Sequence, residues 1–235
     1  MSMSADAIRD EKVKVLKSLR PLKGKDVFKN VVRAQYDEGT INGQALSAYR
    51  SEQGVAPRST TESYVALQIA IDNWRWAGVP FFVRAGKRMP HAGTEIAITF
   101  NAVPPVLFNT LGHTLDQNVL VIRIQPNEGI SLGMSAKTPG STLRIEPVKM
   151  NFCYGTSFQK QNPEAYERLL LDAMSGDATL FARSDEVEAA WAFVDGIEEA
   201  WLQSSDDLCF YKSGTSGPDK ADDLISSCGA SWRKL

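Results

Sequence analysis

The feature that most constrains the fold is a succession of short strand-like segments between residues 60 and 151, with no helical pattern between them. In the clearest segment Val65, Leu67 and Ile69 alternate with small or polar residues, a period of two that is typical of a strand. The other predicted strands are residues 27–36, 81–84, 95–100, 119–125, 130–136 and 143–151. Because strands that follow one another without helices pair with their neighbours, this pattern predicts a mostly antiparallel sheet.

Helical patterns occur before and after these strands. The predicted helices are residues 6–20, about 163–175, from 184 to about 201, and 218–228. In the third of them Trp191 and Trp201 fall on the predicted buried stripe. The polar, glycine-containing run from 37 to 58 is predicted to be a long surface loop. Strands followed by helices predict an α+β fold, with helices packed on one face of a large, mostly antiparallel sheet.

Composition and charge exclude several classes of protein. The 235 residues suit one domain spanning 1–235, because no internal repeat or change of composition divides the chain. Lys and Arg number 26 and Asp and Glu 28, so the net charge is −2 and no overall positive field favours nucleic acid. Three widely spaced cysteines argue against a disulfide framework, and no segment has the apolar length of a membrane span. These observations predict a cytoplasmic protein without nucleic-acid or membrane partners.

Several catalytic and cofactor motifs are missing from the sequence. No glycine-rich dinucleotide turn or phosphate-binding loop follows a strand, and no Ser nucleophile elbow is present. The two histidines, His91 and His113, lie in polar loops and have no metal-ligand spacing. The sequence therefore predicts no catalytic residue, no metal site and no cofactor-binding residue in this chain.

Two clusters of polar residues end apolar strands. Arg84, Lys87 and Arg88 surround a glycine and would place positive charge at the rim of a sheet, where a phosphate could approach the backbone. They also suit protection of a sheet edge or pairing with surface carboxylates. Arg123 and Gln125 share one face of the apolar strand 119–125, where the pair could bind sugar hydroxyls or Arg123 could form a buried salt bridge. The residues alone leave these alternatives open.

Six ordered strings resemble one family, the glucose-6-phosphate dehydrogenases. They are residues 9–16 (RDEKVKVL), 72–81 (DNWRWAGVPF), 84–87 (RAGK), 122–128 (IRIQPNE), 165–172 (AYERLLLD) and 183–186 (RSDE). The resemblance covers essentially the whole chain but only the C-terminal half of that enzyme. It implies an NADP-dependent oxidation of glucose 6-phosphate to the phosphogluconolactone, the entry step of the pentose phosphate pathway, for the full-length enzyme.

The resemblance also implies that this chain is incomplete as a catalyst. The family's N-terminal Rossmann domain, its phosphate-binding segment and its catalytic histidine are not among these residues. We therefore expect no turnover from this chain, no bound NADP, and only weak binding of glucose 6-phosphate. The alternative is a stand-alone, non-catalytic module that dimerises or binds a sugar phosphate.

The resemblance assigns roles to a few residues. Lys87 and Gln125 match the family's lysine and glutamine that contact substrate. A further basic residue of the family falls on Ala92, so its contact would be absent or come from Arg88 or His91. Arg84 and Arg123 match arginines that bind a structural NADP in animal enzymes, and are predicted here to form structural or intersubunit salt bridges. The sequence departs from the rest of that NADP site at Ser131, Gly133 and Ser216.

The family's large sheet forms its subunit interface, which implies a homodimer through the sheet. Strands with one strongly apolar face need helices on that face, so we expect the opposite face to pair with a second copy.

Overall fold

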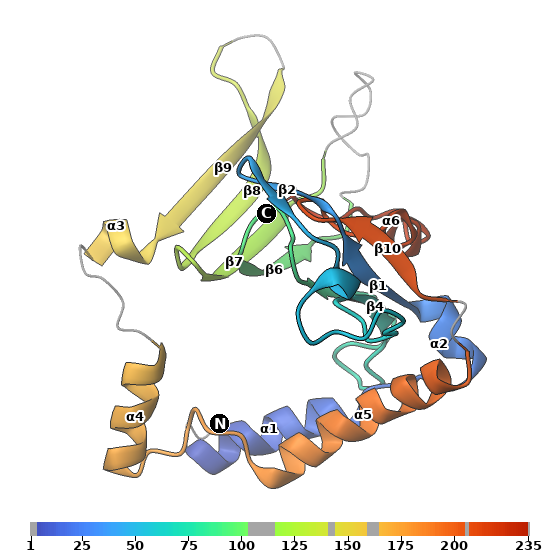
Figure 1. Ribbon diagram of the computed structural model, residues 1–235. Helices are drawn as coiled ribbons and strands as arrows, with labels where there is room; N and C mark the ends of the chain where they lie inside the picture. Colours follow the sequence, from blue (N-terminus) through green and yellow to red (C-terminus); the bar gives the residue numbers. More distant parts are fainter. Residues whose placement is uncertain (1–3, 103–115, 141–143, 159–164, 205–206, 235) are drawn as a thin grey trace. The chain divides into compact units, whose positions relative to one another are not determined.

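The chain divides into two compact units, each described by itself. The structure is a computed structural model that describes residues 4–102, 116–140, 144–158, 165–204 and 207–234. Unit 1 comprises Met1–Pro90 and Ala165–Lys234, and unit 2 comprises His91–Glu164 (Figure 1). The helices and strands confirm the predicted α+β class.

Unit 1 is built on a four-stranded sheet in the order β10-β1-β4-β5. Its strands are β1 (Val31–Asp37), β4 (Tyr64–Ile69), β5 (Phe81–Gly86) and β10 (Cys209–Lys212), with a separate hairpin of β2 (Gly39–Ile41) and β3 (Gln44–Leu46). Its helices are α1 (Ala5–Lys17), α2 (Lys25–Asn30), α4 (Ala165–Ser175), α5 (Ser184–Leu202) and α6 (Asp219–Ser226), with a 3-10 turn η1 (Tyr49–Ser51). β1 pairs antiparallel with β4 and parallel with β10, so the sheet is mixed.

Helices cover both faces of this sheet, rather than the one face predicted. On one face Ala34, Tyr64 and Ala66 are buried with Leu224 of α6. On the other face Val31 and the half-buried Val65 and Leu67 pack with residues of α2 and α5. Figure 1 shows α5 running beside α1, with which it is in contact. Because β1 and β4 bury both of their faces, alternation of apolar and polar residues understated how deeply they lie in the core.

Unit 2 is a four-stranded antiparallel sheet in the order β6-β7-β8-β9. The strands are β6 (Thr94–Thr99), β7 (Val119–Gln125), β8 (Gly129–Lys137) and β9 (Ile145–Cys153), followed by the short helix α3 (Tyr154–Phe158). Their register aligns apolar side chains in rows that cross all four strands. We call this face the apolar face; its two central rows are Ile96, Ile122, Ile130 and Phe152, and Ile98, Leu120, Leu132 and Met150.

Three local predictions are wrong. Residues 27–30 belong to α2, where Asn30 donates to the carbonyl of Asp26 and only residues 31–37 form the strand. The predicted loop at 37–58 contains the β2–β3 hairpin, whose Asn42 and Gly43 both have positive φ. Trp191 is 56% exposed, because α5 turns Gly196, Ile197 and Ala200 inward instead.

The other predicted elements lie close to their expected positions. β7 has the predicted bounds, and the strands β4, β5, β6, β8 and β9, the first helix and the helices α4 to α6 differ by a few residues at their ends. Gly176, with a positive φ, follows the end of α4. Residues 163 and 164 of this predicted helix lie outside the described residues.

Candidate functional site

Lys87 follows the end of β5 and presents its side chain to solvent. Gly86, the last residue of β5, packs against the ring of Tyr64, from which a Cβ atom at this position would lie only 2.5 Å away. The Lys87 amide donates to the Ser63 carbonyl at 2.9 Å, and its own carbonyl accepts from the Tyr211 hydroxyl at 2.6 Å. The Lys87 ammonium contacts no partner among the described residues. An unpaired ammonium on a fixed backbone is suited to bind an anion.

Arg88, the next residue, is engaged within the protein. It has a φ of 53°, and its guanidinium donates to Glu52 at 3.1 Å and lies 5.6 Å from the centre of the Tyr36 ring. Its carbonyl accepts from the Gly214 amide at 2.7 Å. The hydrogen bonds to Glu52 and Tyr36 raise the pKa of Arg88 further above its usual range. Arg88 is therefore occupied with a carboxylate rather than presented beside Lys87 as a second free cation.

Arg84 is engaged with the C-terminal segment of unit 1. Its guanidinium donates to the carbonyl oxygens of Ser216 and Arg233 and lies 4.9 Å from the centre of the Trp232 ring. These partners within the chain are backbone carbonyls and an aromatic ring, and the predicted structural or intersubunit salt bridge of Arg84 stays a prediction. The three predicted cations thus have different surroundings, and Lys87 alone among them lacks a partner in the described part of the chain.

Unit 2 carries the other predicted residues, at the end of β7. Gln125 is exposed, and its side-chain amide lies 3.5 Å from the Thr94 hydroxyl on β6. Arg123 donates to the Asn151 side chain at 2.9 Å and to the carbonyls of Phe152 and Asn127. Arg123 therefore connects the β7–β8 turn to β9. Lys87 belongs to unit 1 and Gln125 to unit 2.

The remaining predicted residues carry little chemistry. His91 is exposed, and His113 lies outside the described residues. Within the described ranges, no group of three or more His, Cys, Asp or Glu side chains could hold a metal ion. No helix in the described part of the chain is both long enough and apolar enough to cross a bilayer.

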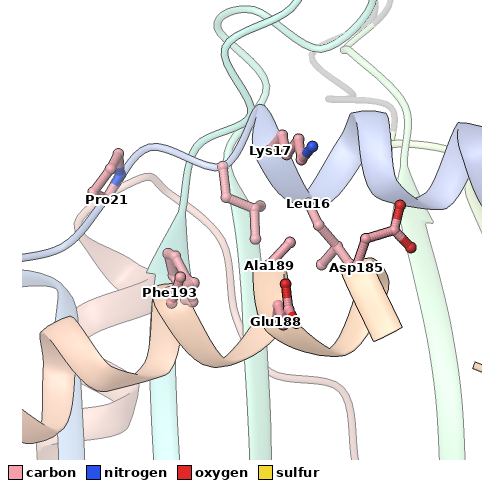
Figure 2. Close-up of a pocket in the computed structure, with 9 residues that line it drawn as sticks. Leu16, Lys17, Pro21, Asp185, Glu188, Ala189 and Phe193 are labelled. Carbon is pink, nitrogen blue, oxygen red and sulfur yellow. The ribbon is translucent and has the colours of Figure 1, made fainter. Parts of the chain in front are cut away.

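A shallow cavity of about 400 Å³ lies between α1 and α5 (Figure 2). Apolar side chains of both helices line it, among them Leu16 and Phe193, and Lys17, Asp185 and Glu188 contribute its charges. None of the residues predicted to contact substrate lines this cavity. It therefore does not coincide with the site at Lys87.

The partners of Lys87 and Arg88 were not found from the sequence. Ser63, Glu52 and Tyr211 come from three separate segments, and Tyr211 is 124 positions from Lys87. Tyr211 lies on β10, a four-residue strand that was not predicted. A pattern local to residues 84–88 gives no signal for these contacts.

Comparisons with known proteins decide the family. Residues 1–233 match the sequence profile described as "Glucose-6-phosphate dehydrogenase, C-terminal domain". The chain belongs to the glucose-6-phosphate dehydrogenase family. It is 46% identical over 232 residues to the glucose-6-phosphate 1-dehydrogenase of Treponema pallidum and 43% identical over 232 residues to that of Bacillus subtilis. The two matches cover 98% and 99% of this chain but only 45% and 47% of the relatives, so the chain spans slightly less than half their length.

Solved structures of glucose-6-phosphate dehydrogenases share the fold. One, described as a glucose-6-phosphate dehydrogenase in complex with its substrate glucose-6-phosphate, matches with a TM-score of 0.85 and 32% identity. The match covers 100% of this chain and 47% of that one. A glucose-6-phosphate 1-dehydrogenase from Mycobacterium avium matches with a TM-score of 0.79 and 34% identity, covering 100% of this chain and 46% of that one.

Proposed function

We propose that this chain is the substrate-side and subunit-association part of an enzyme that oxidises glucose 6-phosphate to the phosphogluconolactone with NADP. The family and the coverage of slightly less than half of each relative support this proposal. A cytoplasmic location and a place in the pentose phosphate pathway belong to the same proposal.

The observation that carries the proposal is the unpaired ammonium of Lys87. A phosphate monoester carries up to two negative charges, and charge-assisted hydrogen bonds are the strongest that a side chain makes. Gln125, exposed at the end of β7, supplies an amide that can donate to and accept from sugar hydroxyls. We assign substrate contact to Lys87 and Gln125, and structural roles to Arg84, Arg88 and Arg123.

Binding of glucose 6-phosphate by this chain is expected to be weak and to depend on Lys87. We expect a dissociation constant on the order of 1 mM or weaker in an NMR titration, because few groups contact the ligand. Lys87→Gln should weaken binding about ten-fold, as a lost charged hydrogen bond does. Lys220→Gln, an exposed lysine of α6, is the matched control and should leave binding unchanged. Equal effects of the two substitutions would contradict the assignment.

We expect this chain to have no dehydrogenase activity by itself. The sequence has no histidine beyond His91 and His113 to act as the base, and neither lies in a motif of the family's catalytic histidine. Incubation with glucose 6-phosphate and NADP should produce no reduced cofactor. Turnover by a sample of verified mass would overturn this part of the proposal and would favour a complete active site within these residues.

The surroundings of Arg84 and Arg123 do not fit a bound NADP. Both guanidinium groups already donate to backbone carbonyl oxygens, and Ser131, Gly133 and Ser216 supply neither a charge nor an aromatic ring. We therefore assign no NADP-binding residue to this chain, and the cofactor of the full-length enzyme would be held by other residues.

We also propose a homodimer through the sheet of unit 2. The apolar face carries the exposed side chains of Ile96, Ile98 and Met150, with exposed fractions of 41% to 56%. Exposed apolar surface of this kind is typical of a protein interface. This assignment differs from the sequence expectation, in which helices covered the apolar face and the opposite face paired.

A further inference from the structure

We propose that Tyr211 is a positioning residue for Lys87, assisted by the Arg88–Glu52 ion pair. The proposal rests on the proposed function, in which Lys87 contacts the phosphate of the substrate. Tyr211 holds the Lys87 carbonyl and Glu52 holds the neighbouring Arg88 side chain, so that the Lys87 side chain extends from a fixed backbone. Neither residue is proposed to touch the substrate.

The backbone of Lys87 is held at both of its polar groups. Its amide donates to the Ser63 carbonyl at 2.9 Å, and the Tyr211 hydroxyl donates to its carbonyl at 2.6 Å. Ser63 is itself fixed to β1, because its amide donates to the Ala34 carbonyl and its hydroxyl accepts from the Tyr36 amide, each at 2.9 Å. The segment after β5 is therefore attached to the central strand of the sheet.

Arg88, the next residue, is held through both its backbone and its side chain. The Arg88 carbonyl accepts from the Gly214 amide, and the guanidinium is held at 3.1 Å by Glu52, which also accepts from the Tyr36 hydroxyl at 3.2 Å. A φ of 53° is uncommon for residues other than Gly, Asn or Asp, so Arg88 needs these contacts to keep this backbone conformation. The Arg88 side chain thus points to Glu52 while Lys87 remains free.

The chemistry of Tyr211 suits this role better than core packing alone. Its ring is 4% exposed and lies 5.3 Å from the Tyr64 ring, a place that phenylalanine would fill as well. The hydroxyl adds the hydrogen bond to the Lys87 carbonyl and lies 3.4 Å from the Ser63 carbonyl. A tyrosine hydroxyl is protonated at neutral pH, and burial raises the pKa of Tyr211 further above that range, so the hydroxyl remains a donor.

The test compares Tyr211→Phe with Tyr49→Phe in this chain. Tyr49 packs in the same core cluster, and its hydroxyl has no hydrogen-bond partner among the described residues, so Tyr49→Phe is the matched control. Glu52→Gln is a second variant, which removes the counter-charge of Arg88 and leaves the hydroxyl of Tyr211 in place. Each variant is examined by backbone 15N relaxation without ligand and by titration with glucose 6-phosphate.

Tyr211→Phe should lower the order parameter of the Lys87 amide from about 0.85, the value of rigid backbone, towards about 0.6. It should also weaken glucose 6-phosphate binding about five-fold, as one lost hydrogen bond does. Glu52→Gln should act in the same direction on Arg88 and Lys87, and Tyr49→Phe should change neither quantity. An unchanged order parameter at Lys87, or unchanged binding despite lost order, would overturn the proposal.

The relaxation measurement separates this proposal from the proposed function. If glucose 6-phosphate shifts no Lys87 resonance in the unsubstituted chain, the assignment of substrate contact is wrong. The order of the Lys87 backbone is measured without ligand, so in that case lost order in Tyr211→Phe would still show that the Tyr211 hydroxyl holds this backbone, and unchanged order would refute it. Where the unsubstituted chain binds glucose 6-phosphate, order and binding must both fall for the proposal to stand.

Discussion

At the scale of single residues, the core of unit 1 contains charge that is paired within the protein. Arg33 on β1 is 4% exposed, and its guanidinium donates to Asp207 at 3.0 and 2.8 Å and to the Ser204 carbonyl at 2.9 Å. The same guanidinium lies 5.0 Å from the centre of the Trp201 ring. This buried cation is tolerated because it meets a carboxylate, a backbone carbonyl and an aromatic face. This cluster attaches the end of α5 to the sheet.

Asp207→Ala should destabilise unit 1 by about 3 kcal/mol, because it leaves the buried Arg33 guanidinium without its counter-charge. The change is measured as a lower urea midpoint of unfolding. The control is Asp72→Ala, which removes the partner of Arg20 from an ion pair whose side chains are 63% and 52% exposed. Because exposed pairs add little stability, this midpoint should hardly move. Similar effects of both substitutions would show that Arg33 does not depend on Asp207.

Ionisation of Tyr64 should lower the stability of unit 1 at alkaline pH. Burial raises the pKa of Tyr64 to about 12, and the nearby Arg84 charge opposes the rise. The unfolded chain ionises near its ordinary pKa of about 10, so stability is unchanged below that pH and falls as pH rises towards about 12. Tyr64→Phe should reduce this fall at little cost near neutral pH, since by geometry the buried hydroxyl makes no hydrogen bond to the described residues.

Urea unfolding followed by circular dichroism from about pH 8 to about pH 12 measures the effect. Tyr211, whose pKa is also raised by burial, should preserve part of the pH dependence in Tyr64→Phe. Tyr166→Phe changes a tyrosine that is 80% exposed on α4 and serves as the control. An identical alkaline profile in Tyr64→Phe and the unsubstituted chain would refute the assignment.

At the scale of elements, local pattern predicted most strands and helices but not the contacts that join them. The alternation at 119–125 defined β7, because one of its faces is consistently apolar. β10 was not predicted, because its four residues are too few to show a periodicity and its partner β1 is far away in sequence. Lys87 was identified through the family motif, whereas Tyr211 was not, since a hydroxyl-to-carbonyl contact leaves no local signature. The apolar arc of α5 is wide, so periodicity could not decide that Trp191 faces outward.

The packing of α5 depends on a glycine. Gly196 lies against the Leu22 carbonyl, where a Cβ atom would come within 2.8 Å of the oxygen. Gly196→Ala should therefore destabilise unit 1 by about 1 to 3 kcal/mol through overpacking, although alanine favours helices in general. All five tryptophans lie in unit 1, so the midpoint of the tryptophan fluorescence transition measures the effect.

Gly155 provides the control for that substitution. It lies in α3 of unit 2, where a Cβ atom would meet nothing within 4 Å. Gly155→Ala should leave the fluorescence midpoint unchanged or raise it slightly. A Gly196→Ala chain as stable as the unsubstituted one would mean that α5 shifts freely away from residues 22 and 23.

At the scale of the whole molecule, the two units differ in how far helices cover the faces of their sheets. The sheet of unit 1 has helices on both faces, whereas among the described helices of unit 2 only the short α3 meets the apolar face, where the Phe158 ring lies 6.2 Å from that of Phe152. Ile96, Ile98 and Met150 of this face remain exposed, and exposed apolar surface of this kind is typical of a protein interface. A second copy of the same face would remove apolar side chains from water on both partners at once, with the self-complementarity of a two-fold contact.

Met150→Lys tests this argument, since Met150 lies in a central row of the apolar face and is 56% exposed. The unsubstituted chain should sediment as a dimer at micromolar concentration, and Met150→Lys should weaken the dimer at least about ten-fold, because two charges enter an apolar contact. Lys149→Gln changes the neighbouring residue of β9, which points to the opposite face, and should leave the dimer intact. Monomers of the unsubstituted chain, or loss of the dimer in Lys149→Gln but not in Met150→Lys, would reject the apolar face as the interface.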